Sequence, residues 1–121
     1  MRIFKNTWFT RFAAKEGITD NELREMVNQL EEGQYYANLG GGVYKMQTAR
    51  SGEGKASGYR VIVFFKSGER TFFVYGFAKS EKDNIDQGEL RAFKQRAKDA
   101  FSMTEEHIEK RISNGTLIEV F

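Results

Sequence analysis

One segment in the middle of the chain constrains the fold more than any other feature. Residues 59–66 (YRVIVFFK) and 70–78 (RTFFVYGFA) are two nearly continuous apolar runs, separated by Ser67, Gly68 and Glu69. A three-residue connection with a central glycine predicts an antiparallel hairpin. Because the runs are apolar at consecutive positions, both faces of this hairpin need cover. We therefore expect two central strands of a sheet that is covered by helices.

Helix-start signals flank the hairpin on both sides. Thr19 with Glu22, and Asp86 with Glu89, have the three-residue spacing of a capping box, and Thr104 is a further N-cap residue. Apolar residues then recur at helical spacing after each of these starts. The pattern predicts helices over residues 18–33, 85–101 and 103–115, and a shorter aromatic-faced helix over residues 7–15.

The remaining strand signals complete an α+β domain. Residues 43–49 (VYKMQTA) alternate in polarity, and residues 2–4 and 116–120 are weaker candidates for edge strands. Two helices, three strands and two helices then follow one another along the chain. This order is typical of a small antiparallel β-sheet flanked by N-terminal and C-terminal helices. We expect residues 1–121 to form a single domain.

Composition excludes several classes of site and location. The chain has no cysteine and one histidine, which excludes a disulfide framework, a cysteine-based metal site and a histidine-rich metal site. We expect no metal and no cofactor. The N-terminus lacks the apolar segment of a signal peptide, and no run approaches the roughly 20 apolar residues of a membrane span. The expectation is a soluble cytoplasmic protein with no membrane partner.

Positive charge is concentrated around the predicted strands. Between Tyr44 and Lys82 there are eight Lys or Arg residues against three Asp or Glu residues, a local net charge of +5. If the three strands are neighbours, the polar residues on them and on their connections converge at one end of the sheet: Lys45, Gln47, Arg50, Lys55, Arg60, Lys79 and Lys82. Lysine and arginine together suit phosphate binding. Three nearby aromatic residues, Tyr59, Tyr75 and Phe77, are candidates for stacking on RNA bases.

Arg60 leaves two interpretations open. It begins an apolar strand and shares a strand face with Ile62 and Phe64. An arginine on such a face stays charged where the face opens to solvent or to an anion, because burial without a partner is costly. Arg60 is therefore either a phosphate-binding residue or the partner of an acid such as Glu81 that secures the fold.

Three stretches carry a resemblance to a known family. Residues 39–65 (LGGGVYKMQTARSGEGKASGYRVIVFF), residues 72–85 (FFVYGFAKSEKDNI) and residues 114–120 (NGTLIEV) resemble the RelE/HigB-type toxins of bacterial toxin–antitoxin pairs. The resemblance spans nearly the whole chain. It implies the fold predicted above and an endoribonuclease that cuts mRNA in the ribosomal A site without metal. It also implies silencing by a small antitoxin, which we expect to be a helix-turn-helix protein.

The resemblance assigns roles to individual residues. It implies Lys45, Arg60 and Lys79 as catalytic residues, and the same surface implies RNA-binding residues at Gln47, Arg50, Lys55, Tyr59, Phe77 and Lys82. Two positions depart from the family pattern: Gln47 stands where relatives carry a second base, and no tyrosine follows residues 78–84 (AKSEKDN). A glutamine donates a hydrogen bond but supplies no charge. Two other functions therefore remain open, namely a ParE-like inhibitor of DNA gyrase and an RNA- or ribosome-binding module with weak catalysis.

Overall fold

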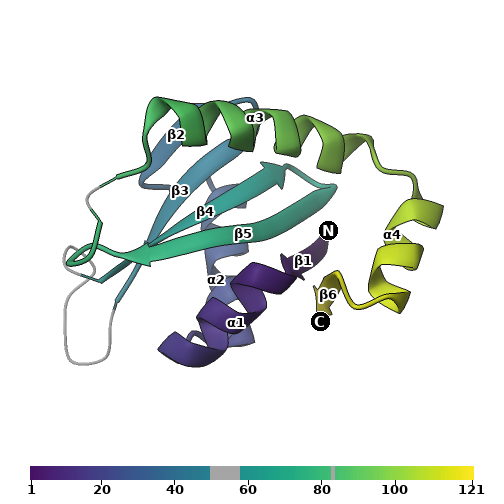
Figure 1. The fold of residues 1–121 in the computed structure, drawn as a ribbon, viewed down its shortest axis with the longest axis horizontal. Helices are drawn as coiled ribbons and strands as arrows, with labels where there is room; N and C mark the ends of the chain where they lie inside the picture. Colours follow the sequence, from purple (N-terminus) through teal and green to yellow (C-terminus); the bar gives the residue numbers. More distant parts are fainter. Residues whose placement is uncertain (50–57, 83) are drawn as a thin grey trace.

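The computed structural model describes residues 1–49, 58–82 and 84–121 (Figure 1). In chain order its elements are β1 (Arg2–Asn6), α1 (Thr7–Glu16), α2 (Asp20–Glu31), β2 (Ala37–Gly40), β3 (Val43–Thr48), β4 (Tyr59–Lys66), β5 (Arg70–Ala78), α3 (Gln87–Ser102), α4 (Glu105–Ser113) and β6 (Leu117–Val120). The strands form one six-stranded sheet in the order β2-β3-β4-β5-β1-β6. The predicted α+β class with flanking helices is confirmed.

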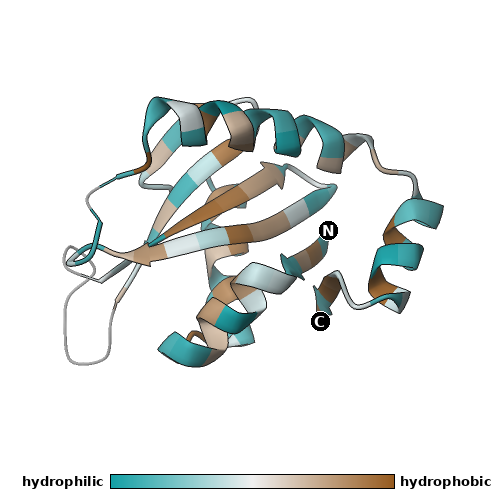
Figure 2. Cartoon of the chain, viewed as in Figure 1, coloured by the Kyte–Doolittle hydropathy of each residue, from teal (hydrophilic) through white to brown (hydrophobic). Residues whose placement is uncertain are grey.

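Helices cover both faces of the sheet, as the apolar hairpin requires. Seven of the eight residues of β4 are buried, and Figure 2 shows hydrophobic residues concentrated along this strand. One core lies between the sheet and α1 and α2, and includes Phe9, Leu23 and Phe73. The other lies between the sheet and α3 and α4, and includes Ile62 and Phe93. The predicted central position of the hairpin is confirmed.

The helix starts follow from local side-chain chemistry. Thr19 and Glu22 cap α2 reciprocally, and Asp86 and Glu89 do the same for α3. The hydroxyl of Thr104 accepts a hydrogen bond from the backbone of α4. Each cap satisfies backbone N–H groups that have no partner inside the helix. All three predicted N-caps are confirmed.

The N-terminal strand differs from the prediction of an edge strand. β1 lies inside the sheet, where it pairs parallel with β5 and antiparallel with β6, while the other strand pairs are antiparallel. Its side chains explain this position, because Ile3 packs in one core and Phe4 in the other. Its charges are paired: Arg2 contacts Glu119 at 2.7 Å and Lys5 contacts Asp20 at 2.9 Å. β6 lies at the edge, as expected.

A register shift interrupts the pairing of β4 with β5. Ile62 pairs with Tyr75 and Val63 pairs with Phe73, so Val74 is an extra residue on β5. Such a bulge changes which side chains of a strand share a face. Val74 and Tyr75 consequently both pack in the core below α3 and α4.

Gly76 allows α1 to approach β5 closely. A Cβ atom at this position would lie 2.4 Å from the Phe12 ring, which is closer than packed carbon atoms approach. We therefore expect Gly76→Ala to lower the free energy of unfolding by about 1–3 kcal/mol. Urea denaturation measures the loss, and Phe12→Leu in the same chain should recover part of it. A Gly76→Ala variant of unchanged stability would contradict this packing.

Candidate nucleic-acid interface

Three neighbouring strands bring the predicted polar residues into register. Gln47 of β3 pairs with Arg60 of β4, and Arg60 pairs with Phe77 of β5. Residues that pair across neighbouring strands share a face of the sheet. Lys45 is two residues before Gln47 in β3 and therefore lies on the same face. Lys45, Gln47, Arg60 and Phe77 thus form one surface at this end of the sheet.

Two cations of this surface are buried. Only 7% of Lys45 and 4% of Arg60 is exposed. The Lys45 ammonium donates a hydrogen bond to Oδ1 of Asn84 at 2.8 Å. The Tyr36 ring lies 5.2 Å from Lys45 Nζ and 5.0 Å from the Arg60 guanidinium carbon. Within the described residues, Lys45 has no carboxylate partner, so neutral groups alone contact this buried charge.

The cations are close enough to affect one another. Burial lowers the pKa of the Lys45 ammonium, and the charges of Arg60 and Lys79 lower this pKa further, while Tyr36 acts in the opposite direction. Like charges held together in a low-dielectric site disfavour the charged form. The prediction that Lys45, Arg60 and Lys79 lie together is therefore confirmed, since the charges of the other two act on Lys45. We call these three residues the cation cluster.

The other predicted site residues have different environments. Lys82 forms an ion pair with Glu89 at 2.7 Å, and its Nζ lies 5.8 Å from the centre of the Phe77 ring. Tyr59 lies in the opposite core, is 3% exposed, and donates a hydrogen bond to Glu16. Alternation along β4 explains this, since Tyr59 precedes Arg60 by one residue. The structure does not bring Tyr59 to the cation cluster, and Arg50 and Lys55 are outside the described residues.

Two residues beside the cluster escaped the sequence prediction. Tyr36 comes from the segment before β2, and Asn84 comes from the segment before α3. Neither belongs to a predicted helix or strand, although Asn84 lies within residues 72–85, which carry part of the resemblance. The one available signal was two adjacent tyrosines in a polar segment, Tyr35 and Tyr36, and the structure leaves both more than 40% exposed.

One comparison with known proteins gives a match over almost the whole chain. Residues 1–120 match the family model described as the RelE toxin of the RelE / RelB toxin-antitoxin system. The chain belongs to the RelE toxin family. Searches of curated proteins and of solved structures gave no match. Membership of the RelE family makes this chain a toxin of a toxin–antitoxin system and implies an antitoxin as its partner.

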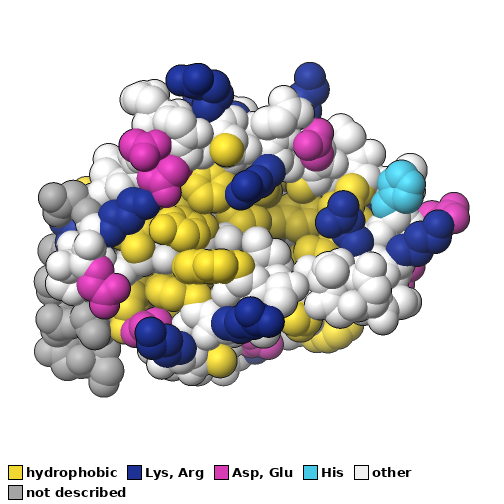
Figure 3. Space-filling model, viewed as in Figure 1, with side chains coloured by type: hydrophobic (Ala, Val, Ile, Leu, Met, Phe, Trp, Pro, Cys, Tyr) yellow, Lys and Arg dark blue, Asp and Glu magenta, His cyan; other side chains and the backbone are white. Residues whose placement is uncertain are grey.

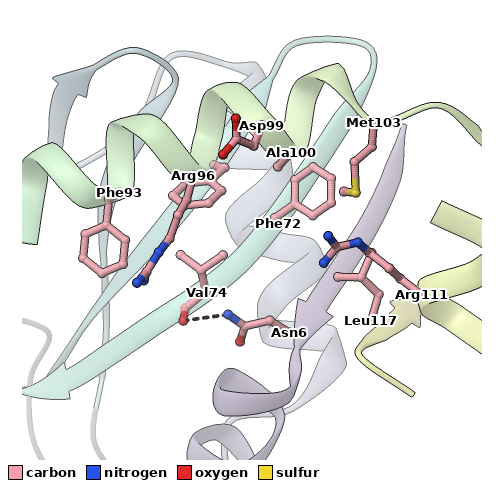
Figure 4. A pocket seen from close by; sticks show the side chains of 11 residues that line it. Asn6, Phe72, Val74, Phe93, Arg96, Asp99, Ala100, Met103, Arg111 and Leu117 are labelled. Atoms are coloured by element: carbon pink, nitrogen blue, oxygen red, sulfur yellow. Dashed lines mark hydrogen bonds between the residues drawn. The ribbon is translucent and has the colours of Figure 1, made fainter. Parts of the chain in front are cut away.

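A second surface of this RelE-family chain is apolar. Figure 3 shows a hydrophobic band across the face of Figure 1, with lysine and arginine side chains along its borders. A pocket of about 290 Å³ lies in this band, between the sheet and helices α3 and α4 (Figure 4). Phe72, Val74 and Phe93 form part of its wall, and Arg96 and Arg111 also line it. We call this band the apolar groove.

Two further observations concern metal binding and membrane spans in the part of the chain that the structure describes. Among the described residues, no group of three or more histidine, aspartate or glutamate side chains is placed to hold a metal ion. In the same residues, every helix is too short or too polar to cross a membrane.

Proposed function

We propose that this RelE-family toxin is a cytoplasmic mRNA endoribonuclease that acts on the ribosome and inhibits translation. The cation cluster carries the proposal. Lys45 is buried with neutral partners, and the charges of Arg60 and Lys79 act on it. A phosphate bound there would offset charge repulsion that the folded chain otherwise bears. Gln47 and Phe77 flank Arg60 in the strand register and supply a neutral donor and an aromatic wall.

The chemistry follows from these positions. The 2′-oxygen of a ribose attacks the adjacent phosphorus, and the bond from phosphorus to the 5′-oxygen breaks. Arg60 stabilises the charge that develops on the phosphoryl oxygens, and Lys79 adds to the positive potential. Lys45 donates a proton to the leaving 5′-oxygen, because a lysine of lowered pKa donates more readily near neutral pH. The proton of the 2′-hydroxyl passes to water.

Gln47 favours a second candidate function. It supplies no charge where the resemblance leads us to expect a second base, so the cation cluster lacks one charge. One charged donor is typically worth about 10²–10³ in rate. An RNA- or ribosome-binding module with weak catalysis is therefore the alternative that the residues themselves support.

Expression of the chain alone tests the function. We expect growth arrest with loss of intact mRNA, measured by northern blotting and by mapping the cleaved ends. The control is the same chain with Lys45→Met, which we expect to be harmless. Arrest with intact transcripts and broken DNA would instead indicate a gyrase inhibitor. A wild-type chain that is harmless would indicate the weakly active module.

We also propose that a segment of a helix-turn-helix antitoxin covers the apolar groove. An exposed apolar surface on a small protein is typical of a protein interaction site. Its wall has two arginines, Arg96 and Arg111, against one acid, Asp99, and this excess of positive charge favours a segment with acidic flanks. The groove is lined by residues other than those of the cation cluster. An antitoxin segment bound in the groove would therefore leave the RNA site itself unoccupied.

A bulky charged side chain in the apolar groove should prevent neutralisation by the antitoxin without reducing the toxicity of the chain. Ala92 is exposed on α3 and, with Trp8, lines a second pocket that shares Val74, Phe93 and Arg96 with the first and continues the groove. We expect Ala92→Arg to stay toxic but to lose copurification with the antitoxin encoded beside its gene, because arginine fills the space and adds unpaired charge. Gln95→Arg is the matched control, since Gln95 is exposed on the same helix and lines none of these pockets. An Ala92→Arg chain that is still neutralised would exclude the groove.

A further inference from the structure

A small pocket lies beside the cation cluster, at the edge of the sheet. β2 pairs with β3 from Ala37, opposite Lys45, and the segment before β2 turns away from the end of α2. The backbone N–H of Tyr36 donates to the Lys45 carbonyl at 3.1 Å, which holds this segment against β3. The pocket between them has a volume of about 310 Å³, at the lower end of the range of roughly 300–1,000 Å³ for small-ligand sites.

The two tyrosines of this segment pack against different residues. The Tyr35 ring packs edge-on against Tyr44, with 5.1 Å between the ring centroids. Tyr36 lies over Lys45 and Arg60 and is 53% exposed. A flat ring that is anchored by cations and still open to solvent is a suitable platform for stacking a nucleobase.

The rest of the wall is neutral and rich in carboxamides. The lining residues are Gln29, Gln34, Tyr35, Tyr36, Met46 and Gln47, and none is charged. Within the described residues, the three glutamine side chains make no hydrogen bond. Each carboxamide offers one acceptor and two donor hydrogens, which is the mixed pattern that base edges present. The wall therefore suits a flat, neutral, polar group rather than a phosphate.

We infer that this pocket binds one nucleobase of the RNA strand whose phosphate occupies the cation cluster. This inference rests on the proposed function, and it adds a base-binding site that comes from α2, the segment before β2, and β3. Tyr36 links the two sites, because its ring contacts both buried cations and also lines the pocket. Stacking of the base on Tyr36 positions the RNA strand, and the glutamine side chains contact the edge of the base. The pocket thus makes cleavage depend on the base next to the scissile phosphate.

A thermodynamic cycle isolates the base contact. The probes are a 2′-O-methyl RNA trinucleotide, which has no 2′-hydroxyl and cannot be cleaved, and the same trinucleotide with one abasic residue. Binding is measured for both, free and on bacterial ribosomes, with wild-type chain and with Tyr36→Leu. We expect removal of the base to weaken wild-type binding about ten- to a hundredfold. We expect a much smaller loss with Tyr36→Leu, because that variant has no ring for the base to stack on.

Two controls accompany the cycle. Tyr36→Phe keeps the ring and should behave as wild type, and Gln34→Ala should reduce discrimination among the four bases. Gln95→Ala, on α3 and outside the pocket, should leave that discrimination unchanged. Tyr36 and Gln34 are exposed, so melting temperatures should stay close to that of the wild type.

The outcomes separate this inference from the proposed function. If Tyr36→Leu weakens the intact and abasic probes equally, the pocket holds no base and the inference fails, whether or not the chain cleaves RNA. If the cycle shows coupling but unmodified RNA stays intact, the pocket stands and the endoribonuclease proposal fails. If neither probe binds the chain, free or on ribosomes, the base-binding pocket and the endoribonuclease proposal are both overturned.

Discussion

Replacing Arg60 with alanine should abolish RNA cleavage and toxicity while leaving the fold intact. Arg60 pairs in register with Gln47 and Phe77, and its charge acts on Lys45. Loss of one charged donor at a phosphate should lower the cleavage rate by about 10²–10³ or more. Lost packing and relieved repulsion act in opposite directions on stability, so we expect a change of roughly 1 kcal/mol or less. Cleavage assays and thermal melting measure the two effects.

Arg60→Lys is the matched control for this prediction. A lysine keeps the charge but cannot present the planar two-pronged donor of arginine. We expect it to recover little cleavage at unchanged stability. If the alanine variant unfolds and the lysine variant keeps full activity, Arg60 secures the fold through its charge, as the alternative interpretation of the sequence allowed.

Lys45→Met should remove cleavage and raise stability at neutral pH. The Lys45 side chain is 7% exposed and has neutral partners among the described residues, so the folded chain bears the cost of a buried charge. Methionine has a similar shape and no charge to desolvate, and replacing buried charge with packed apolar atoms often stabilises proteins. We expect a gain of about 1 kcal/mol or more by urea denaturation at pH 7. Asn84 Oδ1 still accepts a hydrogen bond from the backbone N–H of Ile85, and Asn84 is exposed to water.

The pH dependence of stability gives an independent measurement on Lys45. The pKa of Lys45 is lowered in the folded chain. At pH values where Lys45 is protonated in both the folded and the unfolded state, its charge therefore lowers the free energy of unfolding. As pH rises through the lowered pKa, the folded state loses its proton while the unfolded state retains its own until about 10.4. The Lys45 contribution to stability therefore increases with pH over this window. Lys45→Met should remove that increase, and an unchanged slope would contradict the burial of a charged ammonium.

The sequence predicted local features well because neighbouring residues determine them. Thr19 and Asp86 cap helices through contacts three residues away, and the hairpin follows from a glycine turn between two apolar runs. β2 was not predicted, because Asn38 and Gly40 disfavour strands and pairing with β3 alone defines it. The interior position of β1 depends on two cores and on distant acids that pair with its charges.

In the candidate site, too, the sequence predicted the residues that strand pairing places and missed those that tertiary contacts bring in. Strand register placed Lys45 and Arg60 together, because a short hairpin and one added strand leave few other arrangements. Tyr59 was assigned to the RNA surface although alternation along its strand already directed it to the opposite core. Tyr36 and Asn84 reach the cluster through tertiary contacts, and neither belongs to a predicted helix or strand.

The bulge at Val74 makes the length of β5 as important as its composition. If β4 and β5 paired without the bulge, Gly76 would lie opposite Arg60, and Phe77 would pair with Tyr59 and point to the other face of the sheet. The position of this aromatic wall therefore depends on one residue of β5, Val74, that has no partner in β4. Deletion of Val74 would therefore remove the bulge and leave Phe77 opposite Arg60, a tolerance of length that a scan of substitutions would miss.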